Sequence, residues 1–214
     1  MVVFAHSVIG ASHVKNVQPC QDASLCVSNQ DYTLIAVADS HGGERYFRSD
    51  VGSRFAVEAV RDYMTDTAVV DVFRKVKREK ERERIILQLK KSIISLWNAL
   101  VTEHAEDNPF TEDGGVKYEA YGTTLITVLQ TNEYFLALQI GDGTCVTVDD
   151  EGVFPMPVPE CEGLYSLHFV TVTRVRNPQK LNCSIISHGC PKKEAVMIFQ
   201  SVRLLTRKFW QILT

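Results

Sequence analysis

The pattern of apolar and polar positions predicts short strands interrupted early in the chain by helices. The most regular apolar run spans Tyr32 to Ala38, and its nearly continuous character predicts a strand buried on both faces. This run stops abruptly at the sequence Asp39-Ser40-His41-Gly42-Gly43. Two shorter strands are predicted before it, over Val2 to Ile9 and over Leu25 to Ser28.

Two helical segments are predicted next. Residues 51 to 64 carry apolar side chains at i, i+4 spacing: Val51, Phe55, Ala59 and Tyr63. A second helix is predicted from roughly Val70 to Glu103, with an apolar stripe that includes Trp97. Its portion from Lys75 to Arg84 is almost entirely charged. Because the signs alternate, we interpret this portion as a solvated helix face, with a partner-binding surface as the alternative.

The pattern changes back to strands after a polar loop. Strands are predicted over residues 125–129, 134–140 and 145–148, with turn residues between them, and residues 195–201 resemble a further strand. A β-meander with helices inserted early indicates an α+β layered fold rather than alternating βαβ units. We therefore expect one domain over residues 1–200 and an aberrant tail over residues 201–214.

Composition narrows the classes of function. A chain of 214 residues with a net charge of −3 is an ordinary globular protein and an unpromising nucleic-acid binder. No stretch approaches the ~18 consecutive apolar residues of a membrane helix, and the N-terminus lacks signal-peptide features. The six cysteines contain no Cys-x-x-Cys pair, which favours reduced thiols and a cytoplasmic location. The oligomeric state is left open.

Three aspartates occupy related positions, since Asp22, Asp39 and Asp142 each lie in or next to a tight turn. A carboxylate at a rigid strand end, beside small residues, is well placed to hold a hard cation. The alternative is that Asp-Gly and Asp-Ser pairs simply make turns, and for Asp142 alone that interpretation is favoured. For Asp39 the functional interpretation is favoured, because a turn does not require the His and two Gly that follow.

Four short motifs together resemble those of the metal-dependent (type 2C) Ser/Thr protein phosphatases. Asp39-Ser40-His41-Gly42-Gly43 is similar to the family's Asp-Gly-His-Gly-Gly signature. Cys20-Gln21-Asp22-Ala23 resembles its Glu-Asp-Ala element, Tyr121-Gly122-Thr123-Thr124 its Gly-Ser/Thr-Thr strand start, and Ile140-Gly141-Asp142-Gly143 its Val-Gly-Asp-Ser turn. The motifs occur in the family's order, and the resemblance covers about residues 5 to 155. The insert-poor organisation is more typical of bacterial members.

The resemblance implies a four-layer α-β-β-α sandwich, in which two antiparallel sheets are flanked by helices. It also implies a centre of two or more Mn²⁺ or Mg²⁺ ions and a phosphorylated protein as substrate. Asp39 would bridge two metals, the Ser40 carbonyl would be a further ligand, and Asp22 would act mostly through metal-bound water. His41 would be the general acid, and Asp142 would help to hold an additional, weaker metal.

The chain also departs from the family pattern. Gln21 stands where the family usually has Glu, which would exchange an anionic ligand for a neutral oxygen. The family's phosphate-binding Arg would fall on Val17, so the nearest cation, Lys15, is the candidate for phosphate binding. The family's later Ser-Asp-Gly and Asp-Asn elements are not found, and residues 202–214 contain no Asp or Glu. We therefore expect the fold to be incomplete at the C-terminus.

Three functions remain open at this point. The first is hydrolysis of phosphoserine and phosphothreonine in proteins by a metal-activated water, which needs no protein nucleophile. The second is a non-catalytic, phosphatase-like regulatory or binding domain, which the substitution at Gln21 and the missing acids favour. The third, an unrelated metallohydrolase, is weaker because no His-rich ligand set is present.

Overall fold

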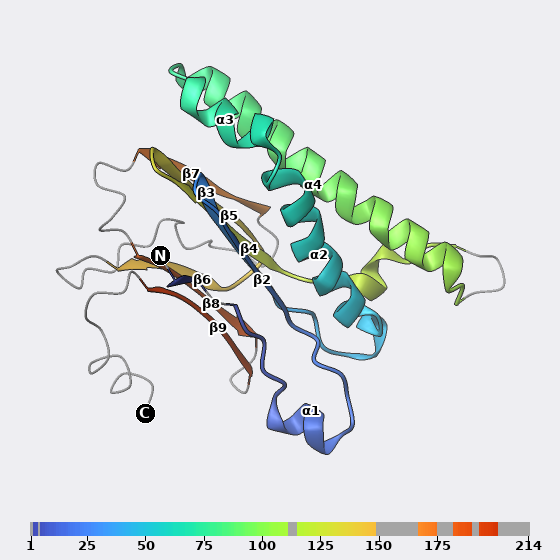
Figure 1. The fold of residues 1–214 in the computed structure, drawn as a ribbon. Coiled ribbons are helices and arrows are strands. Elements are labelled where there is room, and N and C mark those ends of the chain that lie inside the picture. The colour runs from blue at the N-terminus through green and yellow to red at the C-terminus, as the bar shows by residue number, and fades with distance from the viewer. Residues whose placement is uncertain are drawn as a thin grey trace.

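The computed structural model of the chain describes residues 2–3, 5–110, 115–148, 167–174, 182–189 and 193–200. Its strands form two antiparallel sheets that lie face to face (Figure 1). The five-stranded sheet has the order β2-β3-β4-β5-β7, with bounds Ala23–Ser28, Tyr32–Ala38, Leu125–Thr131, Tyr134–Ile140 and Leu167–Arg174. The four-stranded sheet has the order β1-β9-β8-β6, with bounds Val2–Val3, Lys193–Gln200, Asn182–Gly189 and Thr144–Val148.

Helices cover the outer face of the five-stranded sheet (Figure 1). They are α2 (Ser49–Met64), α3 (Thr67–Lys75) and α4 (Glu79–Asp107), while the short α1 (Ala11–Lys15) lies apart, before β2. Two 3-10 turns, η1 (Glu44–Tyr46) and η2 (Tyr118–Tyr121), join these elements. The α+β class and the two antiparallel sheets are as predicted. Among the described residues, no helix lies on the outer face of the four-stranded sheet, and residues 201–214 are outside them.

The central strand β3 separates two apolar cores because its side chains alternate between the faces of the sheet. Leu34, Ala36 and Ala38 belong to the core under the helices. Ile35 and Val37 belong to the core between the sheets, which also contains Cys145 from β6. All five β3 residues named here are at most 1% exposed, so the continuous apolar run in the sequence reflects burial on both faces.

The predicted second helix is two helices. The segment breaks at Val76–Arg78, where Val76 has an extended backbone (φ −78°, ψ 122°) and is buried. Asp66 caps α3, since its side chain accepts a hydrogen bond of 2.7 Å from the Ala68 amide. The Tyr134 hydroxyl of β5 donates 2.6 Å to the Val70 carbonyl, which fastens α3 to the sheet. Burial raises the pKa of this Tyr134 hydroxyl, so it remains a donor.

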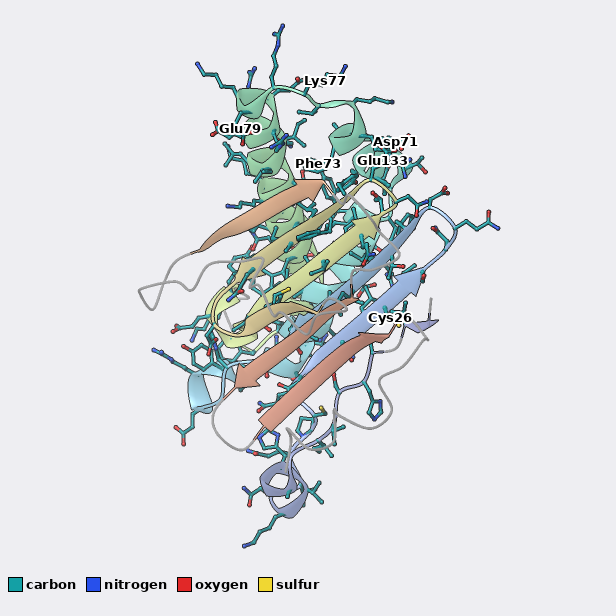
Figure 2. All side chains as sticks on the ribbon, turned by 90° about the vertical axis from the view of Figure 1, so that its left-hand side faces the viewer. Cys26, Asp71, Phe73, Lys77, Glu79 and Glu133 are labelled. Atoms are coloured by element: carbon teal, nitrogen blue, oxygen red, sulfur yellow. The ribbon has the colours of Figure 1, made fainter. Side chains whose placement is uncertain are left out.

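Charged side chains of α3 reach the turn between β4 and β5. Arg74 pairs with Asp71 at 2.8 Å and with Glu133 of that turn at 3.5 Å. Figure 2 shows Asp71, Phe73 and Glu133 together at this edge, with Lys77 and Glu79 beyond them at the helix junction. This end of the molecule carries the charged segment predicted as a solvated face. None of the helices in the described part of the chain is both long enough and apolar enough to cross a lipid bilayer.

The N-terminal strand is shorter than predicted. Among the described residues of this segment, regular pairing is limited to β1, in which Val2 and Val3 pair with Gln200 and Phe199 of β9. The strand predicted from Leu25 begins two residues earlier, at Ala23, so Asp22 directly precedes a strand.

Gly52 marks the place where α2, α4 and η2 meet. A Cβ atom at this position would collide with the Tyr121 carbonyl oxygen, far inside van der Waals contact. The Gly52 carbonyl also accepts a 3.0 Å hydrogen bond from Trp97 Nε1 of α4. The absence of a side chain therefore sets how closely η2, and the strand that follows it, approach α2.

We expect Gly52→Ala to lower the free energy of unfolding by about 3 kcal/mol, because backbone atoms must move to admit the methyl group. Gly42→Ala is the matched control, since no atom lies within 4 Å of a Cβ built at Gly42. The control should change stability by less than about 0.5 kcal/mol. Urea denaturation of both variants checks this, and equal losses would contradict the packing argument.

Candidate metal and catalytic site

The candidate site begins where the ladder between β2 and β3 ends. Ala23 pairs with Ala38 as the last pair of this antiparallel ladder. The next positions outward are Asp22 on one strand and Asp39 on the other. Residues at such opposed positions point to the same face with Cβ atoms about 5 Å apart. Because Ala23 and Ala38 belong to the core under the helices, continued alternation predicts that both carboxylates face the second sheet.

Asp39 is held through its backbone by the start of β4. Its amide donates 3.1 Å to the Thr124 hydroxyl, and its carbonyl accepts from the Thr124 amide at 2.8 Å. The Thr123 hydroxyl donates to the same carbonyl at 3.0 Å. Asp39 is only 7% exposed, so these backbone bonds fix the position of a nearly buried acidic residue.

Two polar side-chain atoms at these strand ends are buried and have no hydrogen-bond partner among the described residues. They are Asp22 Oδ1 and Ser40 Oγ. Buried polar atoms are normally paired, because an unpaired one costs about 1–3 kcal/mol. A carboxylate oxygen left in this state next to a second acidic residue, as Asp22 Oδ1 is, fits a hard cation such as Mn²⁺ or Mg²⁺.

The Ser40 carbonyl stays outside the strand pairing. Ser40 forms an isolated antiparallel bridge with Thr123. The bonds on either side of it join Thr124 to Asp39 and the His41 amide to the Gly122 carbonyl, the latter at 3.1 Å. This pattern leaves the Ser40 carbonyl available to another ligand, as the family resemblance implies.

His41 lies at the exposed edge of the site. Its ring stands edge-on to the Tyr46 ring of η1, with 4.9 Å between ring centroids. Both rings pack closely against Gly122. A Cβ atom at this position would lie 3.0 Å from His41 Cδ2 and 3.1 Å from Tyr46 Cδ1. A residue with a side chain at position 122 would therefore displace the imidazole.

Asp142 is exposed in the turn between β5 and β6. Gly141, with a φ of 84°, packs against Thr124, since a Cβ there would come within 2.8 Å of the Thr124 methyl group. Gln139 Nε2 donates 3.1 Å to both the Gly141 and Gly143 carbonyls and holds the turn in shape. Gly141, the residue before Asp142, therefore packs on the threonine that holds the Asp39 backbone.

Gln21 faces the helices. Its Nε2 donates 3.3 Å to Ser49 Oγ, and its backbone carbonyl accepts 2.7 Å from Ser53 Oγ, both on α2. This places the Gln21 amide on the opposite face of β2 from the Asp22 carboxylate. The assignment of Gln21 as a metal ligand stays a prediction.

Lys15 is exposed at the last position of α1. Val17, where the family's Arg would fall, is 92% exposed and has a φ of 55°, in the left-handed region. It ends the helix, because the Gln18 amide donates 2.9 Å to the His13 carbonyl. No described contact joins Lys15 to the aspartates, so its role in phosphate binding also stays a prediction.

The sequence motifs did not reveal the roles of several neighbours. The sequence motif identifies Thr123 and Thr124 only as the start of a strand. In the structure their hydroxyls hold the Asp39 backbone. Tyr46 and Gln139 belong to none of the four sequence motifs. Within the described residues, no group of three or more His, Cys, Asp or Glu is placed to hold a metal ion. The described part of the site therefore contains two acidic residues, Asp22 and Asp39, and the Ser40 carbonyl that follows Asp39.

A sequence model described as protein phosphatase 2C matches residues 9–198, which is most of the chain. The chain belongs to the protein phosphatase 2C family. Curated proteins include no match to the sequence. The resemblance inferred from four motifs is thus confirmed, and it extends beyond residue 155, where those motifs end.

Solved structures of bacterial phosphatases share the protein phosphatase 2C fold of this chain. A bacterial serine phosphatase, solved as a variant with a single arginine replaced by glutamate, matches at 15% identity and a TM-score of 0.55, covering 87% of this chain and 76% of that one. The Mycobacterium tuberculosis Ser/Thr phosphatase PstP/Ppp matches at 15% identity and a TM-score of 0.50, with the same coverage. At these identities the likeness establishes the fold.

We expect Thr124→Val to lower the free energy of unfolding by about 1–3 kcal/mol, because the buried Asp39 amide loses its acceptor. Thr124→Ser keeps the hydroxyl and serves as the matched variant. Urea denaturation should show the serine variant to be the more stable of the two. The opposite order would mean that packing of the Thr124 methyl group on Gly141 outweighs the hydrogen bond.

Proposed function

We propose that this chain hydrolyses phosphoserine and phosphothreonine esters in proteins, in a reaction that requires Mn²⁺ or Mg²⁺. The observation that carries the proposal is that Asp22 and nearly buried Asp39 are the next residues beyond the last ladder pair, Ala23 and Ala38, with His41 exposed two residues after Asp39. Within the acid pair, Asp22 Oδ1 is buried and lacks a hydrogen-bond partner among the described residues. Family membership supports the class of reaction, since the family is one of protein phosphatases.

Asp39, Asp22 and the Ser40 carbonyl would hold the cations, and Asp142 would contribute at the neighbouring turn. Bound cations would supply neutralisation of the phosphate charge and a lower pKa for water, which is the main requirement for hydrolysing a phosphate monoester. The backbone bonds from Thr123 and Thr124 would keep Asp39 in place during the reaction. Gly122 supports the proposal by leaving room for the imidazole beside the site.

His41 would donate a proton to the leaving seryl or threonyl oxygen. Its exposed position lets a protein substrate approach the ring, and contact with Tyr46 restricts the ring's orientation. Alkoxide is a poor leaving group, so proton donation contributes typically 10²–10⁴-fold in rate.

Asp39→Asn should abolish Mn²⁺-dependent hydrolysis of a phosphoserine peptide, with a fall of about 100-fold or more, because an anionic ligand becomes neutral. Asp62→Asn is the matched control: Asp62 lies on α2 and pairs only with Arg61, at 2.8 Å, among the described ion pairs. The control should retain activity. Well-folded wild-type protein with no activity would instead support the non-catalytic alternative.

His41→Gln should separate the two parts of the proposed chemistry. With a phosphoserine peptide, kcat should fall by about 10²–10⁴-fold because the leaving oxygen needs a proton. With p-nitrophenyl phosphate the fall should be far smaller, since p-nitrophenolate leaves readily as an anion. Steady-state kinetics on both substrates measures the difference. Equal losses on the two would show that His41 is not the general acid.

A further inference from the structure

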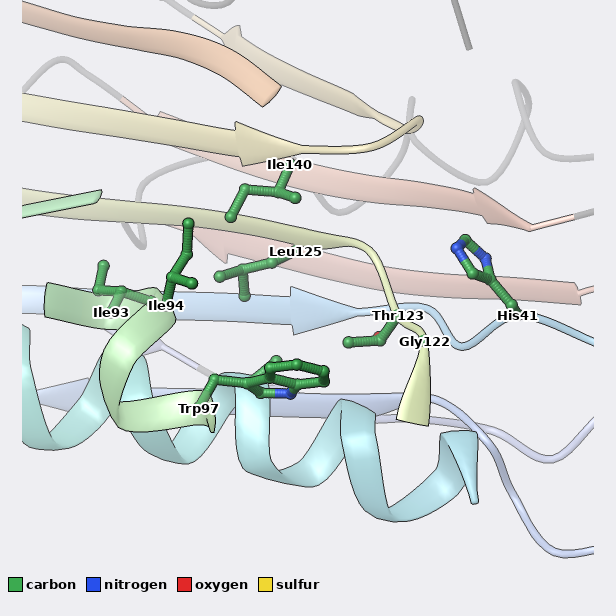
Figure 3. A pocket seen from close by; sticks show the side chains of 9 residues that line it. His41, Ile93, Ile94, Trp97, Gly122, Thr123, Leu125 and Ile140 are labelled. Carbon is green, nitrogen blue, oxygen red and sulfur yellow. The ribbon is translucent and has the colours of Figure 1, made fainter. Parts of the chain in front are cut away.

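A cavity of about 240 Å³ lies beside the candidate site, between the helices and the five-stranded sheet (Figure 3). Its walls come from α2, α4, the start of β4 and the end of β5. The lining residues used below are His41, Ala56, Ile93, Ile94, Trp97 and Leu125. His41 is thus shared between the cavity and the proposed catalytic machinery.

The interior of the cavity offers carbon surface. Ile93, Leu125 and Ala56 are 2%, 3% and 4% exposed and belong to the core under the helices. Trp97 presents its ring, because the indole nitrogen is bonded to the Gly52 carbonyl at 3.0 Å. Among the described residues that line the cavity, His41 alone is ionisable. The occupant that fits is therefore apolar, with its polar connection on the His41 side.

The position of His41 identifies which part of a substrate lies next to the cavity. A general acid contacts the oxygen of the leaving group. In the proposed reaction that oxygen belongs to the phosphorylated serine or threonine, and the peptide continues from it. The cavity is consequently on the leaving-group side, where neighbouring residues of the substrate must pass.

We propose that the cavity binds a bulky aliphatic or aromatic side chain of the protein substrate, one or two residues from the phosphorylated position. This inference rests on the proposed function and adds a sequence preference to it. The size is sufficient, since an apolar protein cavity of about 150 Å³ can hold benzene. One or two residues of extended chain span about 3–7 Å, which suits a cavity that shares a wall with the site.

The test uses two phosphoserine peptides that differ only in one flanking residue, Phe in one and Ala in the other. We expect kcat/KM to be about tenfold or more higher for the Phe peptide, the range that apolar pockets give for small differences in size. Equal kcat/KM values with an active enzyme would overturn the cavity inference and leave hydrolysis itself intact.

Variants then connect the preference to the cavity. Ile94→Ser should reduce the ratio of the two kcat/KM values to within about threefold, because it removes apolar wall. Leu96→Ser is the matched control, since Leu96 is 36% exposed on the same helix, against 37% for Ile94, and does not line the cavity. An unchanged ratio in Ile94→Ser, or an equal change in the control, would overturn the inference. Ala56→Leu fills the cavity from α2 and should also remove the preference.

A measurement of peptide binding by Trp97 fluorescence distinguishes failure of this inference from failure of the proposed function. In a Trp210→Phe background Trp97 is the single tryptophan, because the chain contains two. If no peptide is hydrolysed, the Phe peptide should still change Trp97 fluorescence at concentrations where the Ala peptide does not. No change with either peptide would overturn the inference. An equal change with free N-acetylphenylalanine amide would assign the cavity to a small apolar ligand and overturn it as well.

Discussion

The hydrogen bonds between Asp39 and Thr124 are the constraint on which the rest of the site depends. Both backbone groups of Asp39 are bonded to Thr124, so the end of β3 is fixed to the start of β4. Pairing of β2 with β3 then sets Asp22 opposite Asp39, and packing of Gly141 on Thr124 brings the Asp142 turn to the same edge. Contacts of Thr124 and the β2–β3 pairing together bring segments that carry acids from three places in the sequence to one edge. Asp22 and Asp39 directly adjoin strands, which hold side chains more rigidly than loops do, whereas Asp142 lies in a turn.

The two apolar cores explain why the acids and the cavity are separate but close. Alternation along β3 assigns one set of side chains to the helices and the other to the second sheet. By this alternation the acids face the second sheet. The cavity lies on the helix side, among Ile93, Leu125 and Trp97. Beyond the end of β3, the side chains no longer have to alternate between the two faces of the sheet. His41, two residues after Asp39, can therefore line the cavity on the helix side.

Much of the fold followed from the sequence because long apolar runs leave few alternatives. The strand over residues 32–38 was predicted from such a run, and the polar residues that stop it marked the candidate site. The break at Val76–Arg78 was missed, since it contains neither Gly nor Pro, and buried Val76 continues the apolar pattern. The hydroxyl contacts of Thr123 and Thr124 were missed because Thr also favours strands for its shape alone. The cavity could not be predicted, because unfilled volume depends on how four elements pack.

The acid pair also bears on why this strand end is suited to a cation. Two carboxylates at adjoining strand ends repel each other, and burial of Asp39 penalises its negative charge further. Asp22 Oδ1 adds to this cost, because it is buried with no hydrogen-bond partner among the described residues. A divalent cation between the strands would lower the repulsion and the cost of burial together, and would give Asp22 Oδ1 a ligand. In the proposed site, the arrangement that weakens the fold without metal would also favour metal binding, and apolar substitutions would stabilise the strand end at the expense of that binding.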